Sequence, residues 1–146
     1  MLFNWKPEYA TTITEIDVQH MELVRLGRQI EKLLFSGAED IYDELVELID
    51  SLKAYTIYHF ASEESLLERY AYPALDAHQV EHQKFIDELN EIDLSELDIN
   101  QKAYAMDLIK FISKWIFSHI LGADSDYKLF FMNENLIEKA NSNQTT

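Results

Sequence analysis

Seven residues of this chain carry the side chains of a metal site, at spacings that helices can use. His59 and Glu63 are four residues apart, and so are His78 and His82. Residues at this spacing share one face of a helix, so each pair can act as a two-pronged ligand set. Three further residues complete the set. His20 stands alone early in the chain, and His119 is followed five residues later by the carboxylate of Asp124. All five histidines of the chain belong to this set, which indicates a metal site.

A metal explains this set better than core packing does. A single histidine on an apolar helix face, such as His20 taken alone, is most often an ordinary core residue. Five buried imidazoles would each need partners for both ring nitrogens, and a metal ion supplies one partner per ring. Glu63 follows the spacing of His59 whereas Glu64 does not, so Glu63 is expected to point inward. Asp124 stays open, because five residues turn an α-helix about 140° off the face of the histidine before it. It reaches the site only if the helix breaks, and Gly122 offers such a break.

The number of ligands favours two iron ions. Seven protein ligands are too many for one ion, and imidazole with carboxylate suits iron. In two six-coordinate irons, five nitrogens, two bridging carboxylates and a bridging oxide or hydroxide leave one position open, on the iron with two histidines. The chain has no Glu-x-x-His motif of the carboxylate-rich di-iron bundles, and its nearest match is Asp17-x-x-His20. A site rich in neutral imidazole carries less negative charge, which favours reversible binding over the oxidation of substrates.

Four segments with apolar residues at alternating steps of three and four can position these side chains. They span residues 13–34, 41 to about 69, 73–89 and 98–119. Pro73 suits the first position of the third helix, and Asp98 with Gln101 forms a capping pair that opens the fourth. The apolar stretch 127–132 predicts a short final helix folded back on the others. We therefore expect an all-α, antiparallel up-and-down four-helix bundle with a short C-terminal helical segment. Residues 1–132 would form this domain and residues 133–146 a polar tail, disordered in part.

Composition excludes several classes of protein. A chain of 146 residues is one domain, and its net charge of −15 argues against binding to nucleic acid or to anionic membranes. It has no cysteine, so disulfides, thiolate metal sites and a cysteine nucleophile are excluded. No stretch approaches the roughly 18 apolar residues of a membrane span. The segment MLFNWKPEYATTI lacks the features of a signal peptide, and the expected location is cytoplasmic.

Five stretches of this sequence resemble the hemerythrin family, and specifically its bacterial single-domain form, the bacteriohemerythrins. They are IDVQH at 16–20, HFASEE at 59–64, Tyr72-Pro73 before His78-x-x-x-His82, WIFSHI at 115–120, and Asp124. The resemblance covers residues 3 to 132 and gives Asp124 a place among the ligands. Leu67 stands where bacterial members often have methionine, and this difference is expected to alter the shape of the ligand pocket.

The resemblance implies roles for individual residues. One iron is held by His78, His82 and His119, and the other by His20 and His59, with Glu63 and Asp124 as bridges between them. O2 binds at the open position of the second iron, in an apolar pocket. Family positions assign its lining to Phe60, Trp115, Ile116, Ile120 and Tyr127, and helical spacing adds Leu23 and Val24. For each lining residue the alternative is plain core packing.

The expected function is reversible O2 binding for storage, delivery or scavenging, without enzyme activity. One alternative is a di-iron reductase of O2, peroxide or nitric oxide, although the sequence shows no acid–base group or second redox site for it. Another is an O2 sensor, for which residues 129–132 could form an interface, although packing on the bundle is the simpler reading of this patch. Iron storage is a third alternative, and it needs a cage-forming shell. O2 and nitric oxide are the expected ligands, and no protein partner can be named.

Overall fold

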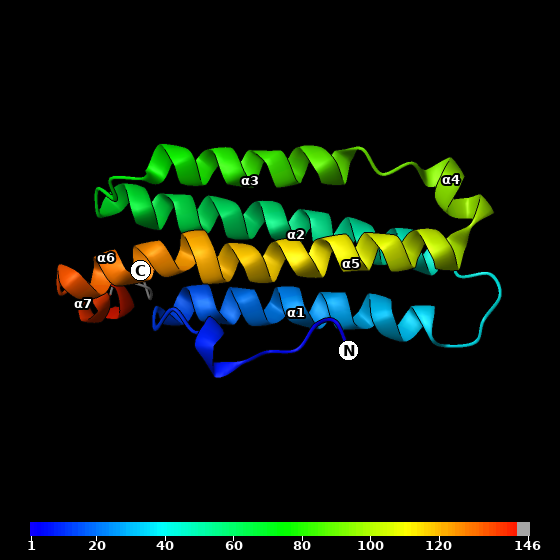
Figure 1. Cartoon of the computed structure of the whole chain (residues 1–146), viewed down its shortest axis with the longest axis horizontal. Helices are drawn as coiled ribbons and strands as arrows, with labels where there is room; N and C mark the ends of the chain where they lie inside the picture. Colours follow the sequence, from blue (N-terminus) through cyan, green and yellow to red (C-terminus); the bar gives the residue numbers. More distant parts are fainter. Residues whose placement is uncertain (143–146) are drawn as a thin grey trace.

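Four long helices form an antiparallel bundle in the computed structural model, which describes residues 1–142. They are α1 (Thr14–Leu34), α2 (Tyr42–Arg69), α3 (Leu75–Asn90) and α5 (Gln101–His119). Successive long helices run in opposite directions, and α1 packs against both α2 and α5 (Figure 1). The predicted all-α bundle is confirmed. No helix within residues 1–142 is long and apolar enough to cross a membrane.

The link between α3 and α5 contains a helix that the sequence reading did not predict. This helix, α4 (Leu94–Ile99), is capped by Asp93, whose side chain accepts hydrogen bonds from two backbone N–H groups of the first turn. The expected capping pair at the start of α5 has a different role. α5 begins after Asn100 without a side-chain cap, and Gln101 Oε1 accepts the backbone N–H of Ile41 at 2.7 Å. Gln101 therefore ties the start of α5 to the start of α2.

Beyond α5 the chain stays helical. A π-helical turn, η2 (Ile120–Asp124), leads into α6 (Ser125–Asn133), and α7 (Ile137–Ser142) follows after a short turn. Both α6 and α7 lie at one end of the bundle, opposite to α4 (Figure 1). Within the segment predicted as a polar tail, residues 137–142 are helical and bury Ala140. Residues 143–146 of that predicted tail lie outside the described residues.

The N-terminal segment lies along α1 and is fixed there by polar contacts. The backbone N–H groups of Leu2 and Phe3 donate to the Glu31 carboxylate, and Arg28 Nε donates to the carbonyl oxygen of Phe3 at 2.7 Å. The ring of Phe3 rests on Gly27, where a Cβ atom would meet it at 2.4 Å. This close approach explains a glycine in the middle of a helix.

The buried apolar residues form two clusters. The larger one runs through α1, α2, α3 and α5 and includes Leu23, Phe60 and Ile116. The smaller cluster lies towards α6 and α7 and consists of Ile13, Ile16, Leu66, Leu67, Tyr127, Phe131 and Ala140. Along α1, His20 falls between Ile16 of the smaller cluster and Leu23 of the larger one, and along α2, Glu63 falls between Phe60 of the larger cluster and Leu66 of the smaller one. A polar site is thus enclosed between two apolar layers.

Candidate metal centre

The structure brings all seven predicted ligands together in the interior of the bundle. His20 comes from α1, His59 and Glu63 from α2, His78 and His82 from α3, His119 from α5, and Asp124 from η2. None of the seven residues is more than 6% exposed. Each long helix contributes at least one of them, so the site depends on the assembled bundle.

Asp124 reaches the site through the π-helical turn η2. In an α-helix it would point away from His119, but a π-helix places about one more residue in each turn. The N–H of Ser125 bonds to the carbonyl oxygen of Ile120, five residues earlier, which is the hydrogen bond of a π-helix. The widened turn brings Asp124 Oδ1 to 3.1 Å from His119 Nε2. The interruption of the α-helix that was predicted at Gly122 is present as this π-helical turn, although the chain stays helical through the residue.

The two oxygens of Glu63 face two different groups of histidines. Oε1 lies 3.0 Å from Nε2 of His82 and 3.7 Å from Nε2 of His119, and it also contacts Nε2 of His78. Oε2 lies 3.4 Å from Nε2 of His59 and 3.7 Å from Nε2 of His20. Glu63 thus stands between a three-histidine group and a two-histidine group.

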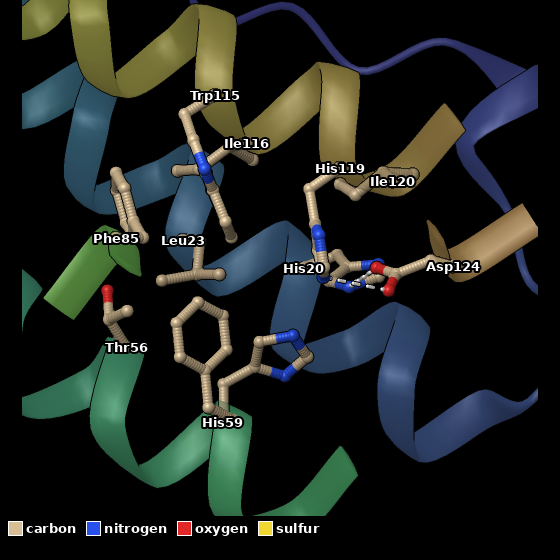
Figure 2. Close-up of a pocket in the computed structure, with 11 residues that line it drawn as sticks. His20, Leu23, Thr56, His59, Phe85, Trp115, Ile116, His119, Ile120 and Asp124 are labelled. Atoms are coloured by element: carbon tan, nitrogen blue, oxygen red, sulfur yellow. Dashed lines mark ion pairs between the residues drawn. The ribbon is translucent and has the colours of Figure 1, made fainter. Parts of the chain in front are cut away.

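Asp124 also stands between the two histidine groups. Its Oδ1 lies 3.2 Å from His78 Nε2. Figure 2 shows its contacts with the other two rings, in which Oδ1 lies close to His119 Nε2 and Oδ2 lies 3.1 Å from His20 Nε2. Both carboxylates therefore present one oxygen to each histidine group. This is the arrangement of two bridging carboxylates between two metal ions.

The ligand atoms converge in two groups that share Glu63. Glu63, His78, His82 and His119 each offer one ligand atom within 4.8 Å of the others, and so do His20, His59 and Glu63. Among residues 1–142, both nitrogens of His20 and both oxygens of Asp124 are buried and make no hydrogen bond of proper geometry. Buried polar atoms without partners are costly, and metal ions would satisfy them. The residues therefore fit a metal centre with two ion positions.

Hydrogen bonds to the ring nitrogen that points away from the site orient two of these histidines. Nδ1 of His59 bonds to Oε1 of Gln19 at 2.7 Å, and Nδ1 of His82 bonds to Oε2 of Glu64 at 2.8 Å. The sequence reading missed these roles. Gln19 follows Ile16 by three residues and precedes Leu23 by four, so the apolar spacing of α1 contained a signal for its burial.

The carboxylates set the charges of three histidines. Burial lowers the pKa of these imidazoles, but the Asp124 and Glu63 carboxylates outweigh it and raise the pKa of His20 and His78 to about 9. The same balance raises the pKa of His119 to about 10. The chain without metal therefore holds these three rings as cations at neutral pH.

Burial dominates at His59. Its pKa is lowered to about 3, although the nearby Glu63 carboxylate acts in the opposite direction. Burial also tends to raise the pKa of Glu63 and Asp124, but the surrounding histidines outweigh it and hold both below their usual values. Burial and the two carboxylates together raise the pKa of Tyr127 well above its usual value. Its hydroxyl keeps its proton and donates to Glu63 Oε2 at 3.0 Å.

A small cavity adjoins the two-histidine group (Figure 2). Its free volume is about 10 Å³, which is room for one water-sized molecule. His20, His59, His119 and Asp124 lie at its polar side. The remaining wall is mostly apolar and consists of Leu23, Thr56, Phe60, Phe85, Trp115, Ile116 and Ile120.

The lining agrees with the sequence reading at five of seven positions. Val24 and Tyr127 do not line the cavity, whereas Thr56 and Phe85, which the sequence reading missed, do. Val24 follows Leu23 by one residue, about 100° around the helix, so only one of them can face a narrow cavity. Tyr127 belongs to the smaller apolar cluster, and so does Leu67, which is not among the residues that line the cavity.

Comparison with known proteins agrees with this geometry. Residues 11–129 match the family model described as the hemerythrin HHE cation binding domain. The chain therefore belongs to the hemerythrin family. It is 33% identical over 127 residues to a bacteriohemerythrin of Clostridium acetobutylicum, covering 86% of this chain and 98% of that protein. It is 30% identical over 126 residues to a bacteriohemerythrin of Pseudomonas aeruginosa, covering 84% and 77%. A hemerythrin of Phascolopsis gouldii is 27% identical over 127 residues, covering 86% and 90%.

Proposed function

We propose that this chain holds two iron ions and binds O2 reversibly at one open position between its helices. The observation that carries the proposal is the division of the carboxylate oxygens between the two histidine groups. In this proposal one ion takes His78, His82 and His119, and the other takes His20 and His59. Glu63 and Asp124 bridge them.

The donor set suits iron. Imidazole nitrogens and carboxylate oxygens are ligands that iron accepts in proteins. When bound, the two ions would supply electrons, and the ion held by His20 and His59 would have one position left for a small ligand. His20 and His59 both line the small cavity, so the open position and the cavity lie on the same side of the centre.

The cavity supports reversible binding of a small apolar molecule. Leu23, Ile116 and Ile120 are each 3% exposed and separate it from bulk water. The hydroxyl of Thr56 already donates to the carbonyl oxygen of Leu52 at 2.7 Å, so it is engaged and does not supply a proton to the cavity. These features favour release of O2 unchanged over its reduction, and nitric oxide is small enough for the same position.

Metal analysis tests the proposed centre. Chain produced with ample iron should contain two irons, in two environments that Mössbauer spectroscopy separates. Glu63→Ala should lose both environments, because Glu63 faces both histidine groups. Glu68→Ala, an exposed glutamate on the same helix, serves as the matched control and should keep them. One iron per chain, or zinc alone, contradicts the proposal.

A further inference from the structure

The two histidine groups differ in the acceptors behind their rings. His59, of the two-histidine group, bonds through Nδ1 to the amide oxygen of Gln19, which is 3% exposed. His82, of the three-histidine group, bonds through Nδ1 to the carboxylate of Glu64. The two-histidine group thus has a neutral acceptor and the three-histidine group an anionic one, at Nδ1–oxygen distances of 2.7 and 2.8 Å.

Two further histidines extend this difference. A second carboxylate lies behind the three-histidine group. It belongs to the half-exposed Glu81 and lies 3.5 Å from Nδ1 of His119. Among residues 1–142, neither Nδ1 of His119 nor Nδ1 of His20 makes a hydrogen bond. Nδ1 of His20, of the two-histidine group, also has no carboxylate at ion-pair distance in this part of the chain, because both ion pairs of His20 involve its Nε2. Acidic outer partners therefore gather behind the three-histidine group alone.

The acceptor behind a ligating imidazole changes what the ring gives to its metal. A ring that binds metal through Nε2 carries its proton on Nδ1 and donates it to the outer acceptor. A carboxylate draws on this proton more strongly than an amide does, which makes the ring a more basic ligand. A more basic ligand stabilises the ferric ion relative to the ferrous ion.

We propose that Gln19 and Glu64 are positioning residues that set different redox preferences for the two ions. Glu64 favours the ferric state at the three-histidine ion. Gln19 leaves His59 a neutral ligand and favours the ferrous state at the two-histidine ion. The inference rests on the proposed di-iron centre. It means that the ion beside the cavity is reduced first and is the last to lose its electron.

Reciprocal substitutions of similar shape test this assignment. Gln19→Glu gives His59 an anionic acceptor, and Glu64→Gln gives His82 a neutral one. The double variant exchanges the two acceptors without changing the net charge. Gln79→Glu, at an exposed position lining the groove next to His82, adds the same charge as Gln19→Glu without contacting a ligand, and it is the matched control.

Midpoint potentials of the iron-loaded protein, titrated anaerobically with dithionite and mediator dyes, are the main readout. Gln19→Glu should change the ferric-to-ferrous ratio of the two-histidine ion at least tenfold in favour of ferric, which is 59 mV for a one-electron couple. Glu64→Gln should shift the other ion by a similar amount in the opposite direction. Glu64→Gln removes a charge from a partly exposed side chain, so this variant does not require the protein to accept a new buried charge.

Azide binding shows which ion is reduced first, because azide binds a ferric ion with an open position. The half-reduced parent should bind azide much more weakly than the fully oxidised parent, whereas the half-reduced double variant should bind it nearly as well. Shifts no larger than that of Gln79→Glu, or undiminished azide binding by the half-reduced parent, overturn the inference. Iron content, measured on each sample, separates the two proposals. Two irons with unchanged potentials overturn only the redox assignment, and a parent without two irons overturns both.

Discussion

Binding of metal should displace about three protons from the chain at neutral pH. Without metal, His20 and His78 have pKa values of about 9 and His119 of about 10, so all three rings are protonated near pH 7. A histidine must be neutral to ligate a metal, so each ring gives up its proton. His59, with its pKa lowered to about 3, has none to give.

The proton count should fall with pH in a defined way. The protonated fractions of the three rings sum to about three at pH 7 and to about one at pH 9.5, from their pKa values. Calorimetry of Zn²⁺ binding to the metal-stripped chain, in buffers of different ionisation enthalpy, measures this number. A hydroxide formed between the ions would add about one proton throughout, leaving the decrease itself unchanged.

The raised pKa values also predict how the stability of the chain without metal depends on pH. The pKa values of these three rings are raised above the unfolded value of 6.5, so their contribution to stability is complete below about pH 6.5. It is lost as the pH rises through 9 to 10. Fewer than about one proton displaced at pH 7, or a count constant from about pH 6.5 to 9.5, refutes the reasoning.

Five substitutions give further predictions. Gly122→Ala should raise the free energy of unfolding by up to about 1 kcal/mol and keep the iron, because a Cβ there meets open space, whereas Gly27→Ala should lower it by about 1–3 kcal/mol. Ile116→Ala should open the cavity wall to water and speed the decay of the O2 complex to the ferric state. His20→Ala should release or loosen one iron and leave the three-histidine ion in place, whereas His119→Ala should affect the other ion.

A separate measurement tests each of these predictions. Chemical denaturation compares the two glycine variants, and loss of iron from Gly122→Ala contradicts the account of η2. Ile109→Ala is the control for Ile116→Ala, because Ile109 is fully buried on the same helix but does not line the cavity. Equal decay rates in these two variants show that Ile116 does not guard the site. Equal loss of both environments in His20→Ala and His119→Ala argues against the assignment of ligands.

The long helices could be predicted because apolar spacing reports which face of a helix is buried. α1 ends at Leu34, before Ser36 and Gly37, as expected, and α2 ends at Arg69. The short helices α4 and α7 could not be predicted in this way. Each has only six residues, with a single buried residue, Leu97 or Ala140, so neither shows a repeating pattern.

The candidate site could be predicted as a set of residues, but its local geometry could not. The i, i+4 pairs required only an α-helix, whereas Asp124 required the π-helical turn that no spacing rule announces. The contacts of Gln19 and Glu64 with ligand rings depend on how neighbouring helices are rotated, which the spacing within one helix does not determine.

We expect O2 to bind at the open position and to leave unchanged. The direct measurement is an anaerobic titration of the reduced, iron-loaded chain with O2, followed by degassing and a second titration. Reversible binding predicts one O2 for each pair of irons, recovery of the ferrous spectrum on degassing, and the same stoichiometry in the second titration. Consumption of O2 beyond that stoichiometry in the presence of a reductant, or a ferric spectrum that persists after degassing, contradicts it and favours an oxygen reductase.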